Sequence, residues 1–206
     1  AYDVVFGDWS SDVCSSDLTA NQVRIIGGRH RGRRLHFRPG PGLRPTPDRV
    51  RETLFNWLQG EIHGARCLDL FAGSGALGLE ALSRGAAYVL AIESNRRAAQ
   101  SLRDNVERIG EAASVEVRGA DALRLLKAAP ERGFDIVFVD PPFASTLLPE
   151  TCRLLEQNGW LGPAALVYLE QDAHQPWPPM PPNWTILREG AAGQSAHRLL
   201  RRSIPG

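Results

Sequence analysis

The amino-acid sequence predicts an α/β fold: a doubly wound, mostly parallel sheet of seven strands that ends in an antiparallel hairpin and is preceded by a basic N-terminal arm. Two observations predict it. From residue 67 onward, short apolar runs alternate with segments of helical period, a pattern typical of βαβ units. In addition, the 206 residues are 43% hydrophobic and 23% charged, as expected of one globular domain with a sizeable core.

Seven strand-like runs and four intervening helical segments make up this pattern. The runs are Cys67–Phe71, Tyr88–Glu93, Ser114–Val117, Phe134–Asp140, Ala164–Glu170, Trp184–Arg188 and His197–Arg202. The helical segments are Leu77–Arg84, Asn95–Ile109, Asp121–Ala128 and Thr146–Gln157. Strands joined in this way form right-handed parallel crossovers. The last two runs are separated by Gly190-Ala-Ala-Gly193, which is too short for a crossover, so we expect an antiparallel hairpin that closes one sheet edge.

A further helix is expected before the first strand. Thr46 is its predicted N-cap and Pro47 its first helical residue, because a hydroxyl caps free N–H groups and proline is tolerated in the first turn. The helix is expected to end near Gly60. Its predicted apolar face carries Val50, Leu54 and Leu58.

These elements divide the chain into three segments. Residues 1–20 have no clear period and do not resemble the rest of the chain, so they are predicted to be foreign to the fold or disordered. Residues 21–60 form the basic arm plus the helix, and residues 61–206 form the sheet domain. The sequence shows no secretory signal and no apolar run of the ~18 residues that a membrane span needs. We therefore expect a soluble, cytoplasmic protein with no membrane partner.

The cysteines argue against two further classes of protein. Cys14, Cys67 and Cys152 are odd in number, far apart and without CxxC spacing. This arrangement favours neither a disulfide framework nor a zinc site. The sequence therefore predicts ordinary thiols and no metal.

Charge is concentrated in the arm. The net charge is +1, but residues 1–20 hold four of the 23 acids and none of the 24 basic residues, so residues 21–206 carry +5. Nine arginines lie between Arg24 and Arg51, with Asp48 as the one acid among them. Guanidinium groups pair bidentately with phosphate oxygens, so the arm is interpreted as a nucleic-acid contact. A solvated basic face is the alternative.

A glycine-rich turn follows the first strand of the sheet. Gly73, Gly75 and Gly78 satisfy GxGxxG, which lets the backbone and a helix N-terminus approach a ligand. Glu93 ends the second strand, where a carboxylate can accept from both hydroxyls of a ribose or can be a solvated acid that caps the next helix. Asp121 follows the third strand, where it could accept from an adenine amino group or cap the next helix. The turn alone is shared with nicotinamide and flavin enzymes.

The tetrapeptide Asp140-Pro-Pro-Phe143 ends the fourth strand. In a doubly wound sheet this strand lies beside the first, so the tetrapeptide faces the same crevice as the glycine turn. Two prolines fix the backbone and remove two N–H groups, which leaves the Asp140 carboxylate and the Pro141 carbonyl as acceptors for an amino group. Phe143 offers a flat face for stacking a base.

Together these motifs resemble the Rossmann-like class I S-adenosylmethionine-dependent methyltransferases that modify exocyclic amino groups. More narrowly, the chain resembles the bacterial 16S rRNA guanine-N2 methyltransferases of the RsmD type, over Arg24 to Arg202. The blocks that carry this resemblance are Arg24-Ile-Ile-Gly-Gly, Arg31-Gly-Arg, Leu43-Arg-Pro-Thr46, Asp48-Arg-Val-Arg-Glu-Thr-Leu-Phe-Asn-Trp57, Phe71-Ala-Gly-Ser-Gly-Ala-Leu-Gly-Leu-Glu-Ala-Leu-Ser-Arg84 and Val137-Phe-Val-Asp-Pro-Pro-Phe143.

The resemblance implies S-adenosyl-L-methionine as cofactor, 16S rRNA within an assembled or partly assembled small ribosomal subunit as partner, and a monomer. It also implies three sets of site residues. The catalytic set is Asp140, Pro141 and Phe143. The cofactor-binding set is Asp69, Phe71, Ala72, Gly73, Gly75, Glu93, Asp121 and Ala122, with Asp69 near the methionine end. The RNA-binding set is Arg29, Arg31, Arg33, Arg34, Arg44 and Arg49.

Three other functions are weighed against this one. A nicotinamide-dependent dehydrogenase would leave the Asp-Pro-Pro-Phe tetrapeptide and the arm unexplained. A non-catalytic RNA-binding protein that retains the fold would be expected to have lost Asp140 or the glycine turn. A DNA adenine-N6 methyltransferase is the closest alternative. Whether Thr46, Arg49 and Arg51 contact the cofactor or RNA stays open.

Overall fold

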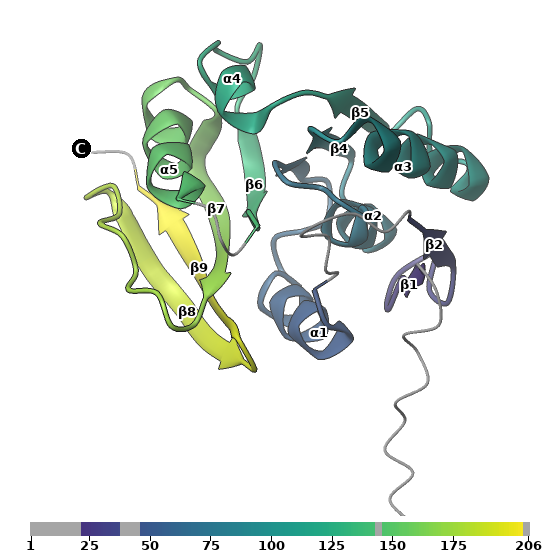
Figure 1. Cartoon of the computed structure of the whole chain (residues 1–206), viewed down its shortest axis with the longest axis horizontal. Coiled ribbons are helices and arrows are strands. Elements are labelled where there is room, and N and C mark those ends of the chain that lie inside the picture. The colour runs from purple at the N-terminus through teal and green to yellow at the C-terminus, as the bar shows by residue number, and fades with distance from the viewer. Residues whose placement is uncertain (1–21, 38–45, 143–145, 204–206) are drawn as a thin grey trace, which may run out of the picture.

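The computed structural model describes residues 22–37, 46–142 and 146–203 (Figure 1). The predictions for residues 1–20, Arg44 and Phe143 lie outside these ranges. Within them, no helix is long and apolar enough to cross a membrane.

A seven-stranded sheet forms the centre of the fold, in the order β5-β4-β3-β6-β7-β9-β8. Its strands are β3 (Arg66–Asp69), β4 (Tyr88–Glu93), β5 (Val115–Gly119), β6 (Phe134–Val139), β7 (Leu161–Asp172), β8 (Trp184–Ala192) and β9 (Ser195–Arg202). The first five strands in the spatial order pair in parallel, whereas β9 pairs antiparallel with both β7 and β8. The predicted doubly wound, mostly parallel sheet with a C-terminal hairpin at one edge is confirmed.

Helices cover both faces of this sheet, as a parallel sheet requires. They are α1 (Asp48–Trp57), α2 (Ala76–Ser83), α3 (Arg96–Ile109), α4 (Ala122–Leu126) and α5 (Leu147–Gln157). One core cluster joins α1, α2 and α3 to residues of one sheet face, including Cys67 and Phe138. A second cluster joins α4 and α5 to the alternate residues of the same strands, including Leu68 and Val137. This alternation follows from the period of two along each strand.

The arm forms a small antiparallel sheet of β1 (Gln22–Arg24) and β2 (Arg34–His36), beside α2 and α3 (Figure 1). Val23, Ile25 and Leu35 are buried in the same core cluster as α1 and α2. The arm is therefore packed on the fold through apolar contacts, while its described arginines from Arg24 to Arg34 are exposed.

The prediction that Thr46 caps α1 is wrong. Pro47 occupies the N-cap position, and no side chain caps the helix. Thr46 lies one residue before the N-cap, and its hydroxyl donates to Asp140 Oδ2 at 3.1 Å. The apolar face was predicted correctly, because Val50, Leu54 and Leu58 are all buried.

The predicted loop at residues 190–193 is also shorter than expected. Gly190, Ala191 and Ala192 belong to β8 and pair with His197, Ala196 and Ser195, and the turn itself lies at Gly193, with φ +59°. Gly190 has a packing reason to lack a side chain, since a Cβ there would lie 2.7 Å from His197 Nε2. Small residues here serve close strand packing rather than a loop.

Candidate active site

A cavity of about 1160 Å³ opens at the carboxyl ends of the central parallel strands. This is the position at which open α/β sheets bind ligands. The cavity is lined by nine of the predicted site residues: Asp69, Phe71, Ala72, Gly73, Glu93, Asp121, Ala122, Asp140 and Pro141. The fold thus brings together most of the residues that the sequence motifs suggested.

The glycine turn shapes one wall of the cavity. Gly73 and Gly75 have φ values of +51° and +80°, a backbone region that favours glycine. Gly75 itself does not line the cavity. It is the N-cap of α2, and a Cβ there would lie 2.3 Å from Leu102 Cδ1. The contribution of Gly75 is therefore to let the chain turn sharply into α2 against α3.

Asp69 lies at the base of the turn and is 2% exposed. Its Oδ2 accepts from the backbone N–H of Gly78 at 3.0 Å. Burial is the main cause that raises the pKa of this carboxyl to about 7; the hydrogen bond from Gly78 opposes the rise and the neighbouring charge of Glu93 contributes to it. A buried carboxylate held this way is suited to a cationic ligand group.

Glu93 is the last residue of β4 and Asp121 follows β5, and both are held by backbone donors. Glu93 accepts from the N–H of Gly73 at 2.9 Å and from that of Asn95 at 2.7 Å. Asp121 accepts from the N–H of Arg124 at 2.7 Å and caps α4. Both side chains also line the cavity, so Asp121 caps α4 and lines the cavity at the same time.

Asp140 ends β6, which pairs directly with β3, so Asp140 and Asp69 lie at neighbouring strand ends. Burial raises the pKa of Asp140 well above its ordinary value, the charges of Glu170 and Asp69 add to this rise, and the hydrogen bond from Thr46 opposes it. Thr46 also lines the cavity. Thr46 is therefore part of the cavity wall and holds the Asp140 carboxyl through its hydroxyl.

Sequence reasoning missed the wall supplied by β7 and the hairpin. Glu170 is 2% exposed and lines the cavity. Residues 192–195 at the hairpin turn line it as well. A signal for Glu170 was present, because it ends a predicted strand just as Glu93 and Asp140 do.

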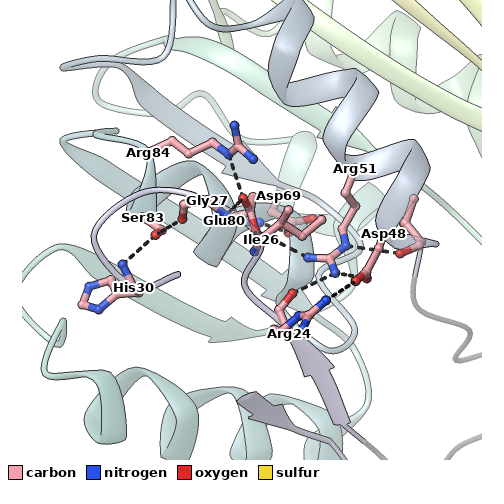
Figure 2. A network of polar contacts seen from close by, with 12 residues as sticks. Arg24, Ile26, Gly27, His30, Asp48, Arg51, Asp69, Glu80, Ser83 and Arg84 are labelled. Carbon is pink, nitrogen blue, oxygen red and sulfur yellow. Dashed lines mark hydrogen bonds and ion pairs between the residues drawn. The ribbon is translucent and has the colours of Figure 1, made fainter. Parts of the chain in front are cut away.

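The arm carries the remaining predicted residues. Arg31, Arg33, Arg34 and Arg49 are exposed, as is Arg29, whose guanidinium lies 3.0 Å from Glu111. Arg51 is fully buried, so it faces neither the solvent nor RNA. Its guanidinium donates to the carbonyl of Arg24 at 2.8 Å and approaches Glu80 within 3.5 Å (Figure 2).

Glu80, on α2, joins the arm to the domain (Figure 2). Its two carboxylate oxygens accept from the backbone N–H groups of Ile26 and Gly27 at 2.7 and 2.8 Å. Arg84 donates to the same carboxylate at 2.7 Å. The arm is thus fixed by a buried charge as well as by apolar packing.

The described residues contain no group of three or more His, Cys, Asp or Glu that could hold a metal ion. The cavity instead offers a wall of carboxylates, backbone N–H groups at the glycine turn, and the two prolines after Asp140. This donor and acceptor set can hold a nucleoside and a cationic group.

Fold and site together define a methyltransferase of class I. The chain belongs to the family described as Conserved hypothetical protein 95, which matches residues 23–201. It is 51% identical over 189 residues to the Ribosomal RNA small subunit methyltransferase D of Escherichia coli K12, covering 91% of this chain and 93% of that protein.

Further relatives support this assignment. The protein of the same name from Haemophilus influenzae is 45% identical over 180 residues, which are 86% of this chain and 93% of the relative. A solved structure described as "Putative methyltransferase yhhF from Escherichia coli" superposes with a TM-score of 0.82 at 51% identity and covers 89% of this chain and 99% of that one. The resemblance stated from the sequence motifs is confirmed.

Proposed function

We propose that this enzyme transfers a methyl group from S-adenosyl-L-methionine to the exocyclic N2 of a guanine in 16S rRNA. The observation that carries the proposal is the pair of acceptors at the end of β6, the Asp140 carboxylate and the Pro141 carbonyl, in the same cavity as the glycine turn and Glu93. The relatives named for methylation of small-subunit ribosomal RNA point to the same class of substrate.

The residues present fit the proposed cofactor. Glu93 is fixed by two backbone donors, so its remaining lone pairs are available to ribose hydroxyls. Asp69 supplies a buried negative charge that matches the ammonium of a methionine moiety. Phe71, Ala72, Gly73 and Ala122 line the same cavity and leave room for a nucleoside. When bound, the cofactor supplies an electrophilic methyl group on a positively charged sulfur.

Asp140 and Pro141 act on the attacking amino group. The N2 lone pair of guanine is delocalised into the ring, so the amino group is a weak nucleophile. When the amino group donates its two N–H groups to the carboxylate and the carbonyl, its nitrogen is favoured in a pyramidal form whose lone pair is free to attack. This interaction strengthens as positive charge develops on the nitrogen, and Asp140 is placed to take the proton that is released.

Positioning supplies most of the remaining rate enhancement. Alignment of two reactants can contribute roughly 7–11 kcal/mol, so a strong general base is not required. We propose that Phe143 stacks on the flipped base and that the arm arginines Arg29, Arg31, Arg33, Arg34, Arg44 and Arg49 guide the phosphates. We further propose that the substrate is an assembled or partly assembled small subunit, and that the enzyme is a monomer in the cytoplasm. The chain would then consist of a foreign segment, an arm with a helix, and a catalytic domain.

The test is transfer of label from S-adenosylmethionine to small subunits that lack the guanine-N2 modification. Asp140→Ala is expected to reduce transfer by at least ~100-fold, as for loss of a group that stabilises transition-state charge, while cofactor binding is retained. Asp135→Ala is a matched control, because Asp135 lies exposed on the same strand, away from the cavity, and should retain transfer.

The alternatives give different results in the same assay. Label that appears in adenine of duplex DNA and not in rRNA would replace the proposal with the DNA adenine-N6 function. Absence of cofactor binding by the intact enzyme would favour a non-catalytic RNA-binding protein. Label on N2-methylguanine that vanishes with Asp140→Ala supports the proposed function.

A further inference from the structure

Glu170 is a buried carboxylate that faces the same cavity as Asp140. It lies on β7, the strand next to β6, and its register position is one residue beyond Leu169, which pairs with Val139. Glu170 and Asp140 therefore occupy equivalent positions at adjacent strand ends. Both line the cavity, and Glu170 is 2% exposed. The proposed transfer to N2 uses Asp140 and leaves Glu170 unexplained.

The surroundings of Glu170 hold it in one orientation. Oε1 accepts from the hydroxyl of Ser195 on β9 at 2.6 Å, and Oε2 accepts from the hydroxyl of Tyr168 at 2.8 Å. Both partners in the described residues are neutral hydroxyls and not cations. Each carboxylate oxygen can accept more than one hydrogen bond, so Glu170 retains acceptor capacity toward the cavity after both hydroxyls are satisfied.

Two neighbouring carboxyls in one cavity are stabilised by a shared proton, or by positive charge or several donors opposite them. Burial raises the pKa of Glu170, and the Ser195 and Tyr168 hydroxyls oppose that rise. The nearness of Glu170 in turn raises the pKa of Asp140. Two ionised carboxylates side by side are unfavourable, and a ligand that offers adjacent N–H donors relieves this repulsion. The cavity thus selects for a ligand edge that donates at two neighbouring positions.

Guanine has such an edge, because N1–H and the N2 amino group are adjacent donors. Adenine presents an acceptor at N1. We infer that Glu170 is a specificity-determining residue that accepts the N1–H of the target guanine while Asp140 accepts from N2. This inference rests on the proposed function and deepens it. A hydrogen bond from N1–H to an anion also increases electron density at N2, where the methyl group is accepted.

The test replaces the N1–H donor of the target base by an acceptor. Small subunits are reconstituted with 16S rRNA that carries either guanine or 2-aminopurine at the position labelled by the wild-type enzyme; 2-aminopurine keeps the 2-amino group but has an acceptor at N1. The wild-type enzyme is expected to prefer guanine by more than ~100-fold in kcat/KM, since a site built to bond an N–H rejects an analogue that lacks it.

Glu170→Gln should reduce that preference. Its amide can donate to N1 of 2-aminopurine, so the guanine to 2-aminopurine ratio is expected to fall at least ~10-fold, with guanine methylation itself reduced by roughly 10- to 100-fold. Ser195→Ala, which only loosens the carboxylate, should lower the ratio by a smaller factor. Glu189→Gln, an exposed change on the same hairpin, should leave the ratio unchanged.

The outcomes separate the inference from the function on which it rests. Cofactor affinity and melting temperature, measured in parallel, should be retained in Glu170→Gln. A wild-type enzyme that methylates guanine, with the same base preference in Glu170→Gln and Ser195→Ala, overturns the inference and leaves the proposed function intact. A wild-type enzyme that places no label on guanine overturns both.

Discussion

The buried carboxyl of Asp69 is suited to ligand binding but lowers the stability of the fold. Its carboxyl is buried and its pKa is raised from 3.8 to about 7, mainly by loss of hydration. The folded state therefore binds this proton more tightly than the unfolded state does. The resulting penalty to the free energy of unfolding is fully present above pH 7 and shrinks as the pH falls toward about 4.

Asp69→Asn is expected to remove this penalty. The amide keeps an acceptor for the Gly78 N–H but has no charge to bury, so the melting temperature of the cofactor-free protein should rise by about 4 °C or more at pH 8. The gain should be smaller at pH 4.5. Calorimetry should also show cofactor affinity reduced by roughly 10-fold or more, through loss of a charged partner.

A suitable comparison is Asp104→Asn, an exposed change on α3, which should alter neither property. An equal stability gain at pH 8 and pH 4.5 would show that ionisation of Asp69 is not the cause.

Individual site residues were predictable where a motif placed an acid at the end of a strand. Glu93 and Asp140 follow this rule, whereas Asp69 was assigned from the family resemblance; all three line one cavity. Thr46 was misassigned because its local context, just before Pro47, is also that of a helix cap. Its true partner, Asp140, is 94 residues away, and local sequence contains no information on such a contact.

At the scale of elements, the attachment of the arm depends on α2. Glu80 binds two backbone N–H groups of the arm and two arginines. The buried Arg51–Glu80 pair is costly to break from one side, because an unpaired charge would remain in the core. These partners come from three separate elements, so the arm was predictable as basic but its anchorage was not.

Gly28 is a point of very close approach between the arm and α2. A Cβ at this position would lie 1.9 Å from the carbonyl oxygen of Ser83, which itself accepts from the Arg29 N–H at 2.8 Å. Gly28→Ala is therefore expected to displace the arm, lower the melting temperature and expose the arm to proteolysis. Methyl transfer to small subunits should fall with it, while cofactor binding is retained.

Gly32→Ala provides the matched control. Gly32 has a φ of +83°, close to the +75° of Gly28, but no atom lies within 4 Å of the position that a Cβ would take there. Both variants carry the same backbone strain, and only Gly28→Ala adds the clash. Equal destabilisation by the two variants would contradict a role for close packing of the arm on α2.

At the scale of the whole molecule, the fold depends on local sequence patterns and the cavity depends on the spatial order of the strands. Strand and helix positions follow from local hydrophobic period, and the sheet with its terminal hairpin was predicted correctly for that reason. The cavity depends on which strand ends become neighbours. The placement of β9 between β7 and β8 brings Ser195 to Glu170, and this spatial order is not encoded in the period of any single segment.

The start of α1 contacts both the cavity and the arm. Thr46 and Pro47, at the start of α1, line the cavity, and α1 contacts the arm through Asp48, which lies 3.7 Å from the Arg24 guanidinium. Helix α1 and the residues just before it thus contact both the arm and the cavity.

This arrangement predicts a specific salt dependence. Replacing Arg31, Arg33 and Arg34 by Gln should weaken binding of small subunits. The slope of log Kd against log salt should fall by about 2, because fewer phosphate contacts mean that fewer counterions are released on binding. The control replaces Lys127, Arg132 and Arg153 by Gln; these exposed residues do not line the cavity, and the change in net charge is the same.

If both triple variants reduce the slope equally, the effect is one of net charge and the arm is not the RNA contact. If the arm variant alone reduces the slope, while both retain cofactor affinity, the arm guides the substrate to the cavity.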